Sequence, residues 1–134
     1  MVRTVLVVDD MAFVRKTISD ILTEAHYQVL GEAKDGQEAI DLYVKLRPDV
    51  VTMDVVMPQM SGIEAARKII KIDKDAKVII LSAMGQENLI MEAIHAGAKD
   101  FVLKPFNPED LLKAIARLFE SESNIRGRSA HREK

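Results

Sequence analysis

The chain has 134 residues, 48% of them hydrophobic, which is enough for one domain with a sizeable core. Its formal net charge is −2, and the stretch after Asn124 has an excess of basic over acidic residues, so the body of the chain is acidic and direct binding to nucleic acid is not expected. The absence of cysteine excludes disulfides, thiolate metal sites and a cysteine nucleophile. The apolar run near the amino terminus is too short for a signal peptide or a membrane span, so we expect a cytoplasmic protein without membrane insertion.

Five short runs rich in branched residues alternate with five longer stretches of helical periodicity. This alternation is typical of parallel strands joined by crossover helices, and it predicts a single doubly wound α/β domain. The weak second run contains Gly31, which favours an edge strand, whereas the fourth run is apolar on both faces and favours an interior strand. The expected strands are residues 5–8, 27–32, 50–53, 78–81 and 101–103.

Helix boundaries are marked by capping residues. A polar residue followed three positions later by an acid predicts a helix start, and glycine or proline near a boundary favours a helix end or a first turn. The first helix is expected from about Ala12. The boundary signals for the later helices are Asp35 with Glu38, Ser61 with Glu64, Gly97, and Asn107 with Pro108. Residues 121–134 are polar and charged without periodicity, so we expect a folded domain over 1–120 and a disordered charged tail over 121–134.

Polar side chains follow four of the predicted strands. Asp9 and Asp10 follow the first, Asp54 the third, Ser82 the fourth and Lys104 the fifth. Because the strands of a doubly wound sheet end at the same edge, these side chains are predicted to meet in one cleft. Each alone has an ordinary interpretation, such as a helix cap for the two adjacent acids or a solvated charge for the lysine, and the hypothesis depends on their joint placement.

Three carboxylates packed together repel one another, and a bound hard cation is the usual resolution. Oxygen ligands without histidine or cysteine indicate Mg²⁺, with Mn²⁺ as the alternative. In that setting Asp54 is the candidate phosphate acceptor, Lys104 would neutralise the transferred group, and Ser82 would donate a hydrogen bond to one of its oxygens.

Four motifs in this order resemble those of the receiver domain of two-component response regulators, most closely the stand-alone chemotaxis receivers. They are Val-Val-Asp-Asp at 7–10, Met-Asp-Val-Val-Met-Pro at 53–58, Leu-Ser-Ala at 81–83 and Lys-Pro-Phe at 104–106. The resemblance covers residues 2 to about 120. It implies a flavodoxin-like (βα)5 fold with strand order 2-1-3-4-5, which periodicity does not supply.

The resemblance also implies residue roles. Asp54 would receive the phosphoryl group from a histidine kinase, and Asp10 and Asp54 would bind Mg²⁺ directly, with Asp9 acting largely through water and Val56 through its backbone carbonyl. The protein would not be an enzyme in the ordinary sense, although it would assist its own phosphorylation and dephosphorylation.

Further roles concern the response to phosphorylation. Ser82 and Phe101 would form a switch pair, and the peptide between Lys104 and Pro105 is expected to be cis. Phenylalanine replaces the tyrosine of the best-known chemotaxis members, and serine replaces the commoner threonine. Val56 and Met84 occupy positions that tune hydrolysis of the acyl phosphate, and because both are apolar we expect slow self-dephosphorylation.

The output implied by the resemblance is protein binding through helix 4, strand 5 and helix 5, with the flagellar motor switch as partner. No output domain is expected after the last helix. Alternatives are a phosphorelay intermediate or another single-domain regulator, an aspartyl-phosphate hydrolase, for which Val56 lacks the expected acid, and a nucleotide binder, which the acids after the first strand disfavour. The seven methionines, the three histidines and the basic tail are interpreted as packing or solvated residues.

Overall fold

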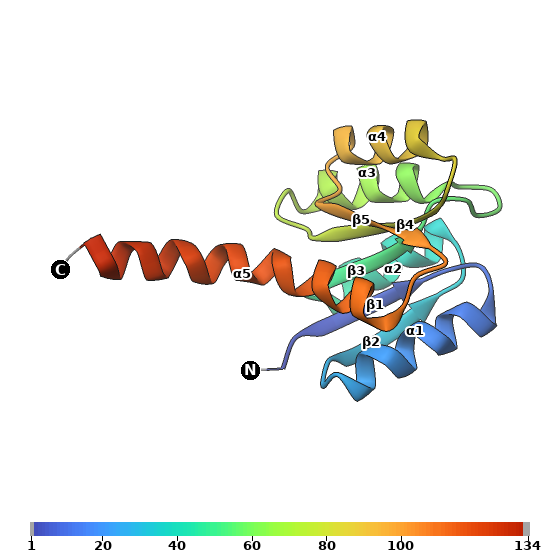
Figure 1. The fold of residues 1–134 in the computed structure, drawn as a ribbon. Helices are drawn as coiled ribbons and strands as arrows, with labels where there is room; N and C mark the ends of the chain where they lie inside the picture. The colour runs from blue at the N-terminus through green and yellow to red at the C-terminus, as the bar shows by residue number, and fades with distance from the viewer. Residues whose placement is uncertain (1, 133–134) are drawn as a thin grey trace.

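The computed structural model describes residues 2–132, with side chains up to residue 120. In this part of the chain five strands alternate with five helices (Figure 1). The strands are β1 (Thr4–Val8), β2 (Gln28–Ala33), β3 (Val50–Asp54), β4 (Val78–Ala83) and β5 (Asp100–Lys104). The helices are α1 (Ala12–Glu24), α2 (Gly36–Leu46), α3 (Gly62–Ile72), α4 (Glu87–His95) and α5 (Pro108–Arg132).

The strands form one parallel sheet in the order β2-β1-β3-β4-β5. This confirms the predicted α/β class and the strand order that the resemblance implied. β2 lies at the edge, as expected. Val5 of β1 pairs with Val29 and the next residue, Leu6, pairs with Gly31, so β2 has one extra residue that forms a bulge. β4 lies inside the sheet between β3 and β5, which agrees with its apolar sequence.

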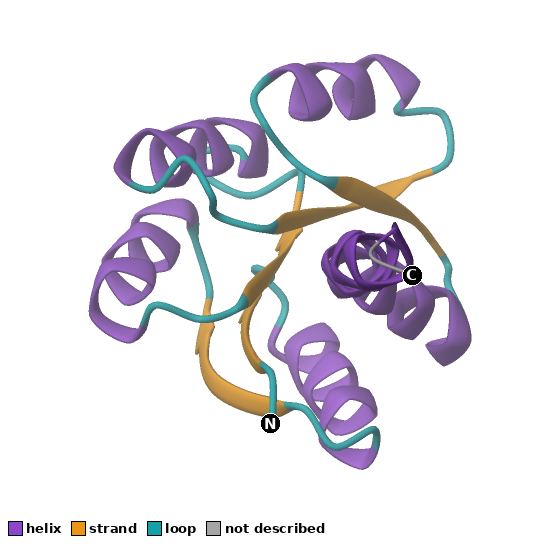
Figure 2. Ribbon diagram, turned by 90° about the vertical axis from the view of Figure 1, so that its left-hand side faces the viewer, coloured by secondary structure: helices purple, strands orange, loops and turns teal. Residues whose placement is uncertain are grey.

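Helices cover both faces of the sheet (Figure 2). Because side chains alternate along a strand, Leu6 and Val8 of β1 face one core while Val5 and Val7 face the other. The first core is closed by α2, α3 and α4, and the second by α1 and α5. This double burial explains why β1, β3 and β4 are continuous apolar runs.

The predicted caps are present at three helix starts. The Asp35 side chain accepts from the Glu38 amide, and Ser61 accepts from that of Glu64. Asn107 accepts from the Asp110 amide at 3.0 Å, one residue before α5 begins at a proline. Gly97 has φ 114°, which allows the chain to turn after α4.

The strand bounds differ from the prediction by one or two residues, and the end of α5 differs by more. β4 and β5 continue beyond 81 and 103, because Ser82 pairs with Leu103 and Ala83 pairs with Lys104. The backbone of α5 is helical to Arg132, past the predicted end near residue 120, and Figure 1 shows it extending away from the sheet. No proline interrupts this segment, so the backbone hydrogen-bonding pattern can continue. The division into a domain and a disordered tail stays a prediction, since the side chains beyond Glu120 are outside the described part.

Candidate functional site

Three carboxylates meet at the carboxyl end of the sheet. Asp9 and Asp10 directly follow β1, and Asp54 is the last residue of β3, which lies beside β1. One carboxylate oxygen from each lies within 4.8 Å of the other two. Asp9 is buried, Asp54 is partly buried and Asp10 is exposed, so the cluster is open to solvent on one side. An oxygen-only donor set with an open side fits Mg²⁺ or Mn²⁺, which keep some water when bound.

Lys104 brings a positive charge into this cluster from the end of β5. Its Nζ lies 3.2 Å from Asp9 Oδ2 and 3.3 Å from Asp54 Oδ1. The peptide that follows it, to Pro105, is cis, as the resemblance implied. One ammonium group therefore faces three carboxylates, and the cluster retains an excess of negative charge.

Burial and charge perturb both Asp54 and Lys104. Burial raises the pKa of Asp54 above its ordinary value; Lys104 opposes this, and Asp9 and Asp10 add to the rise. Burial lowers the pKa of Lys104, but the carboxylates of Asp54 and Asp9 outweigh it, so the net pKa is raised and the ammonium form is favoured. Burial therefore makes the ionised form of Asp54 less favourable than it is in water.

Asp9 also fixes the turn between β1 and α1. Its Oδ1 accepts from the Met11 amide at 2.9 Å, and its backbone carbonyl accepts from Arg15 Nη1 at 2.7 Å. The cap of α1 is Met11, which makes no side-chain cap hydrogen bond. The ordinary interpretation of the two adjacent acids therefore holds in part for Asp9, which orders the turn, while the exposed Asp10 does not cap α1.

The backbone around Asp54 is closely packed against the start of α3. The Gly62 amide donates to the Val55 carbonyl at 2.7 Å, and Val55 donates to the Leu81 carbonyl of β4. A Cβ on Gly62 would overlap the Asp54 carbonyl oxygen, so only glycine permits this approach. The following residue, Val56, exposes 57% of its surface and lines a pocket with residues of α3 and α4.

Ser82 lies at the neighbouring strand end. Asp54 pairs with Leu81 of β4, so Ser82 is one residue further toward the cleft. Its buried hydroxyl donates to Gln86 Oε1 at 2.6 Å, and the Ala83 amide donates to the same oxygen at 2.7 Å. Gln86 was not among the residues predicted from the sequence. Its position, four residues after Ser82 and directly before a helix, is the feature of the sequence that could have indicated this contact.

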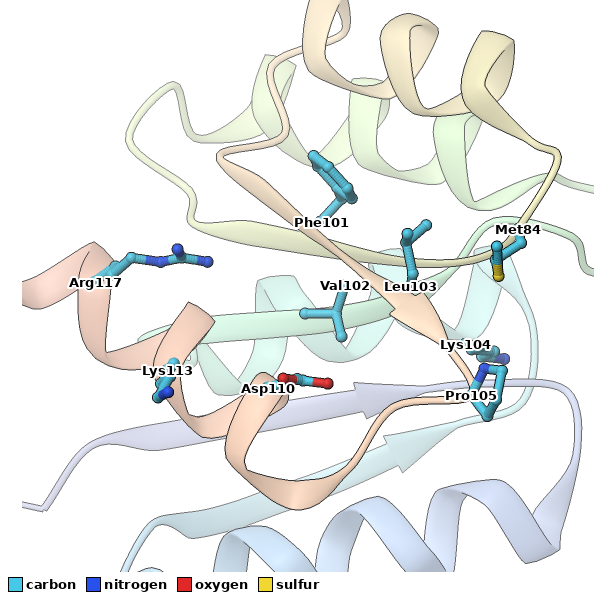
Figure 3. A pocket seen from close by; sticks show the side chains of 9 residues that line it. All are labelled: Met84, Phe101, Val102, Leu103, Lys104, Pro105, Asp110, Lys113 and Arg117. Carbon is cyan, nitrogen blue, oxygen red and sulfur yellow. The ribbon is translucent and has the colours of Figure 1, made fainter.

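Phe101 lies on β5, away from the acids. Its side chain and that of Leu103 point to the same side of the strand, opposite Val102 (Figure 3). Phe101 is 38% exposed and lines a pocket of about 530 Å³ together with Met84, Lys104 and residues of α5. Met84, on the loop after β4, is 76% exposed.

The structure thus brings some of the predicted residues together at the carboxyl end of the sheet and leaves the others outside that cluster. Four of them, Asp9, Asp10, Asp54 and Lys104, are in direct ionic proximity. The other predicted residues have different surroundings: Ser82 is hydrogen-bonded to Gln86, Met84 and Phe101 line the pocket beside α5, and Val56 is exposed.

Comparison with known proteins identifies close relatives. The family model described as "Response regulator receiver domain" matches residues 5–116. The chain is 52% identical to the chemotaxis protein CheY of Thermotoga maritima over 116 residues, covering 87% of this chain and 97% of the relative. It is 54% identical to the protein CcdB of Bacillus subtilis over 114 residues, covering 85% and 95%.

The structure of this chain is also similar to a solved structure from Borrelia burgdorferi. That structure is described as a complex of CheX, CheY, beryllofluoride and magnesium, and the matched chain is 36% identical with a TM-score of 0.84, covering 87% of this chain and 89% of that one. Among the residues that the structure describes, no helix is both long and apolar enough to cross a bilayer.

Proposed function

This chain belongs to the response regulator receiver family, and we propose that it is a single-domain regulator. In this proposal Asp54 accepts a phosphoryl group from a histidine kinase, and the phosphorylated protein then signals by binding another protein. The main support for the proposal is the position of Asp54 and the residues that it contacts. It ends an interior strand, contacts Lys104 at 3.3 Å and shares a cluster with Asp9 and Asp10.

The chemistry required of Asp54 is nucleophilic attack. A carboxylate oxygen of Asp54 forms a bond to phosphorus while the bond from phosphorus to the imidazole nitrogen of the donor breaks, and the imidazole leaves. The high local negative charge keeps Asp54 an effective nucleophile but opposes the approach of a phosphate. Lys104, already within 3.3 Å of Asp54 Oδ1, would pair with the transferred group. The Ser82 hydroxyl would donate a hydrogen bond to one of its oxygens.

A divalent cation fits the site by its donor set. Asp10 and Asp54 would hold it directly, Asp9 through water and Val56 through its carbonyl, and the ion would supply positive charge next to the phosphoryl oxygens. Asp9 is buried, and the pKa of Asp54 is raised first by burial and further by the charges of Asp9 and Asp10, so a cation beside these carboxylates would favour their ionised forms.

Intact-mass measurement tests the phosphoacceptor directly. With Mg²⁺ and a small acyl phosphate, the parent is expected to gain one phosphoryl mass, and Asp54→Asn to gain none. Asp20→Asn, a surface acid paired with Lys16, is the matched control and should behave as the parent. Modification of Asp54→Asn to the same extent, or turnover of many equivalents without an adduct, would contradict the proposal and favour other chemistry.

The lifetime of the adduct is expected to be long. Val56 and Met84, two residues after Asp54 and Ser82, expose 57% and 76% of their surfaces, and apolar side chains neither position nor activate a water molecule. The double variant Val56→Asn, Met84→Glu should lose the phosphoryl group faster than the parent. An unchanged decay rate would remove these two residues from the proposal without affecting Asp54.

The proposed output surface is formed by α4, β5 and α5. The pocket beside Phe101 is lined by both apolar and charged side chains, including Lys113 and Arg117 from α5, and such a mixture suits protein recognition (Figure 3). The similarity to CheY proteins supports the flagellar motor switch as the partner, while the similarity to CcdB keeps a different regulated protein as the second candidate.

Affinity capture with beryllofluoride-loaded protein separates these candidates. Enrichment of a motor switch protein by the loaded parent, and its loss in Phe101→Ala, would support the chemotaxis output. Reproducible capture of a different partner through the same face would favour the second candidate.

A further inference from the structure

The Gln86 side chain accepts hydrogen bonds from both the Ser82 hydroxyl and the Ala83 amide at the end of β4. Its Oε1 lies 2.6 Å from Ser82 Oγ and 2.7 Å from the Ala83 nitrogen. A backbone N–H can donate only to an acceptor, so the amide oxygen, and not the amide nitrogen, faces the strand. The Ser82 hydroxyl must then donate to that oxygen as well, which fixes the position of its proton.

We propose that Gln86 is a positioning residue that competes with the phosphoryl group for the Ser82 hydroxyl, and that its release is a step in the response to phosphorylation. This inference rests on the proposed function. A hydroxyl has one proton to donate, so the bond to Gln86 and a bond to a phosphoryl oxygen exclude each other. The Ala83 amide, which has one hydrogen and the same acceptor, is committed in the same way.

The backbone conformation at Gly85 allows the Gln86 side chain to reach the end of β4. Gly85 has φ +90°, a conformation that favours glycine and reverses the chain between β4 and α4. A Cβ on Gly85 would meet no atom within 4 Å, so glycine is needed for its conformation and not for space. The chain then returns Gln86 to a residue only four positions earlier.

Gln86 also connects the site to α4. It is the N-cap residue of this helix, and its backbone carbonyl accepts from the Ile90 amide at 3.0 Å. Loss of the two side-chain hydrogen bonds would therefore free the first turn of α4 from the end of β4. The same residue would report occupation of the cleft to the face that we propose for output.

The test measures beryllofluoride binding in the presence of Mg²⁺. Gln86→Met keeps the length of the side chain and removes the acceptor, and it should bind beryllofluoride about three- to tenfold more tightly than the parent, as expected when one competing hydrogen bond is lost. Gln28→Met, the same change at the opposite end of the sheet, should bind as the parent does. Equal or weaker binding by Gln86→Met would overturn the inference.

A double-mutant cycle separates competition from a general loosening of the loop. With Ser82→Ala as background, the gain from Gln86→Met should shrink markedly, because the contested hydroxyl is absent. An undiminished gain would contradict the role of Ser82. The amide resonance of Ala83 gives a second readout, since it should shift on Gln86→Met in the metal-free protein and shift again on beryllofluoride binding.

The two possible failures are distinguishable. If the parent shows no binding of beryllofluoride that depends on Asp54, the proposed function falls and this inference falls with it. If the parent binds but Gln86→Met does not differ from it, only the inference about Gln86 is wrong.

Discussion

Acidic residues have different partners at the two ends of the sheet. At the amino end, Asp49 accepts from both the amide and the hydroxyl of Thr4, and Thr4 accepts in return from the Asp49 amide. Asp73, just after α3, is also paired. The Tyr43 hydroxyl donates to its Oδ2 at 2.8 Å, and Arg47 Nη1 lies 3.5 Å from the same oxygen. Each acid there has donors of its own.

At the carboxyl end, Lys104 is the shared ion-pair partner of Asp9 and Asp54, and Asp10 adds a third carboxylate to the cluster. The result is visible in the pKa directions, because burial raises the pKa of Asp54 whereas the hydrogen bond from Tyr43 lowers that of Asp73. The fold therefore stabilises the ionised form of an acid at one end and destabilises it at the other. A carboxylate whose ionised form the fold disfavours is typical of functional sites, and it supports our proposal that the carboxyl end of the sheet is the functional end.

Removing one cation from each end should give the largest difference. Lys104→Met leaves Asp9 and Asp54 without a positive partner, and we expect a loss of about 2–4 kcal/mol in the free energy of unfolding. Arg47→Met removes a partner that is 53% exposed and should cost about 1 kcal/mol or less. Urea unfolding with EDTA present measures both. Equal losses would show that the two ends do not differ.

Backbone crowding at the carboxyl end predicts the next effect. Gly62→Ala places a methyl group against the Asp54 carbonyl oxygen, which cannot move without shifting β3, and should cost about 1–3 kcal/mol. Gly31→Ala meets only the tip of the Leu46 side chain at 3.2 Å, which can adjust, so its cost should stay below about 1 kcal/mol. The free energy of unfolding from urea titration is again the measurement. A smaller loss for Gly62→Ala than for Gly31→Ala would contradict this view.

Sequence alone could predict most of the fold because its signals are local. Apolar runs such as Val78 to Leu81 identify strands, and the pairs at Asp35 and Ser61 identify helix starts. The cluster of Asp9, Asp54 and Lys104 was also predictable, since parallel topology alone brings successive strand ends to one edge.

The features that sequence could not predict depend on side-chain direction. Gln86 acts through a chain reversal at Gly85, and nothing in the residue type shows that its amide returns to Ser82. The last residues of β4 and β5 were missed because their strand character comes from pairing with each other, and Ser82 and Lys104 are polar residues that by themselves favour loops. The length of α5 likewise exceeds what apolar periodicity indicates.

Neutralising one acid at each end should change stability in opposite directions. Asp54→Asn removes a carboxylate whose ionised form the fold disfavours, so the melting temperature in EDTA should rise by a few degrees. Asp73→Asn removes one whose ionised form is favoured, and the melting temperature should fall. Added Mg²⁺ should raise that of the parent but not that of Asp54→Asn. A fall for Asp54→Asn in EDTA would contradict the interpretation of the acidic cluster.

The smallest effect concerns the Tyr43 hydroxyl at the amino end. Burial, followed by the hydrogen bond to Asp73, raises its pKa from 10.0 to about 12. Between these values the unfolded chain loses the tyrosine proton while the folded chain keeps it, so this contribution to stability is present below pH 10 and is lost as the pH rises toward 12. Tyr43→Phe lacks the ionisable group, and urea titrations from pH 8 to pH 11.5 should show the parent more stable at pH 8 and the difference narrowing above pH 10. A constant difference would mean that Tyr43 does not titrate with the expected shift.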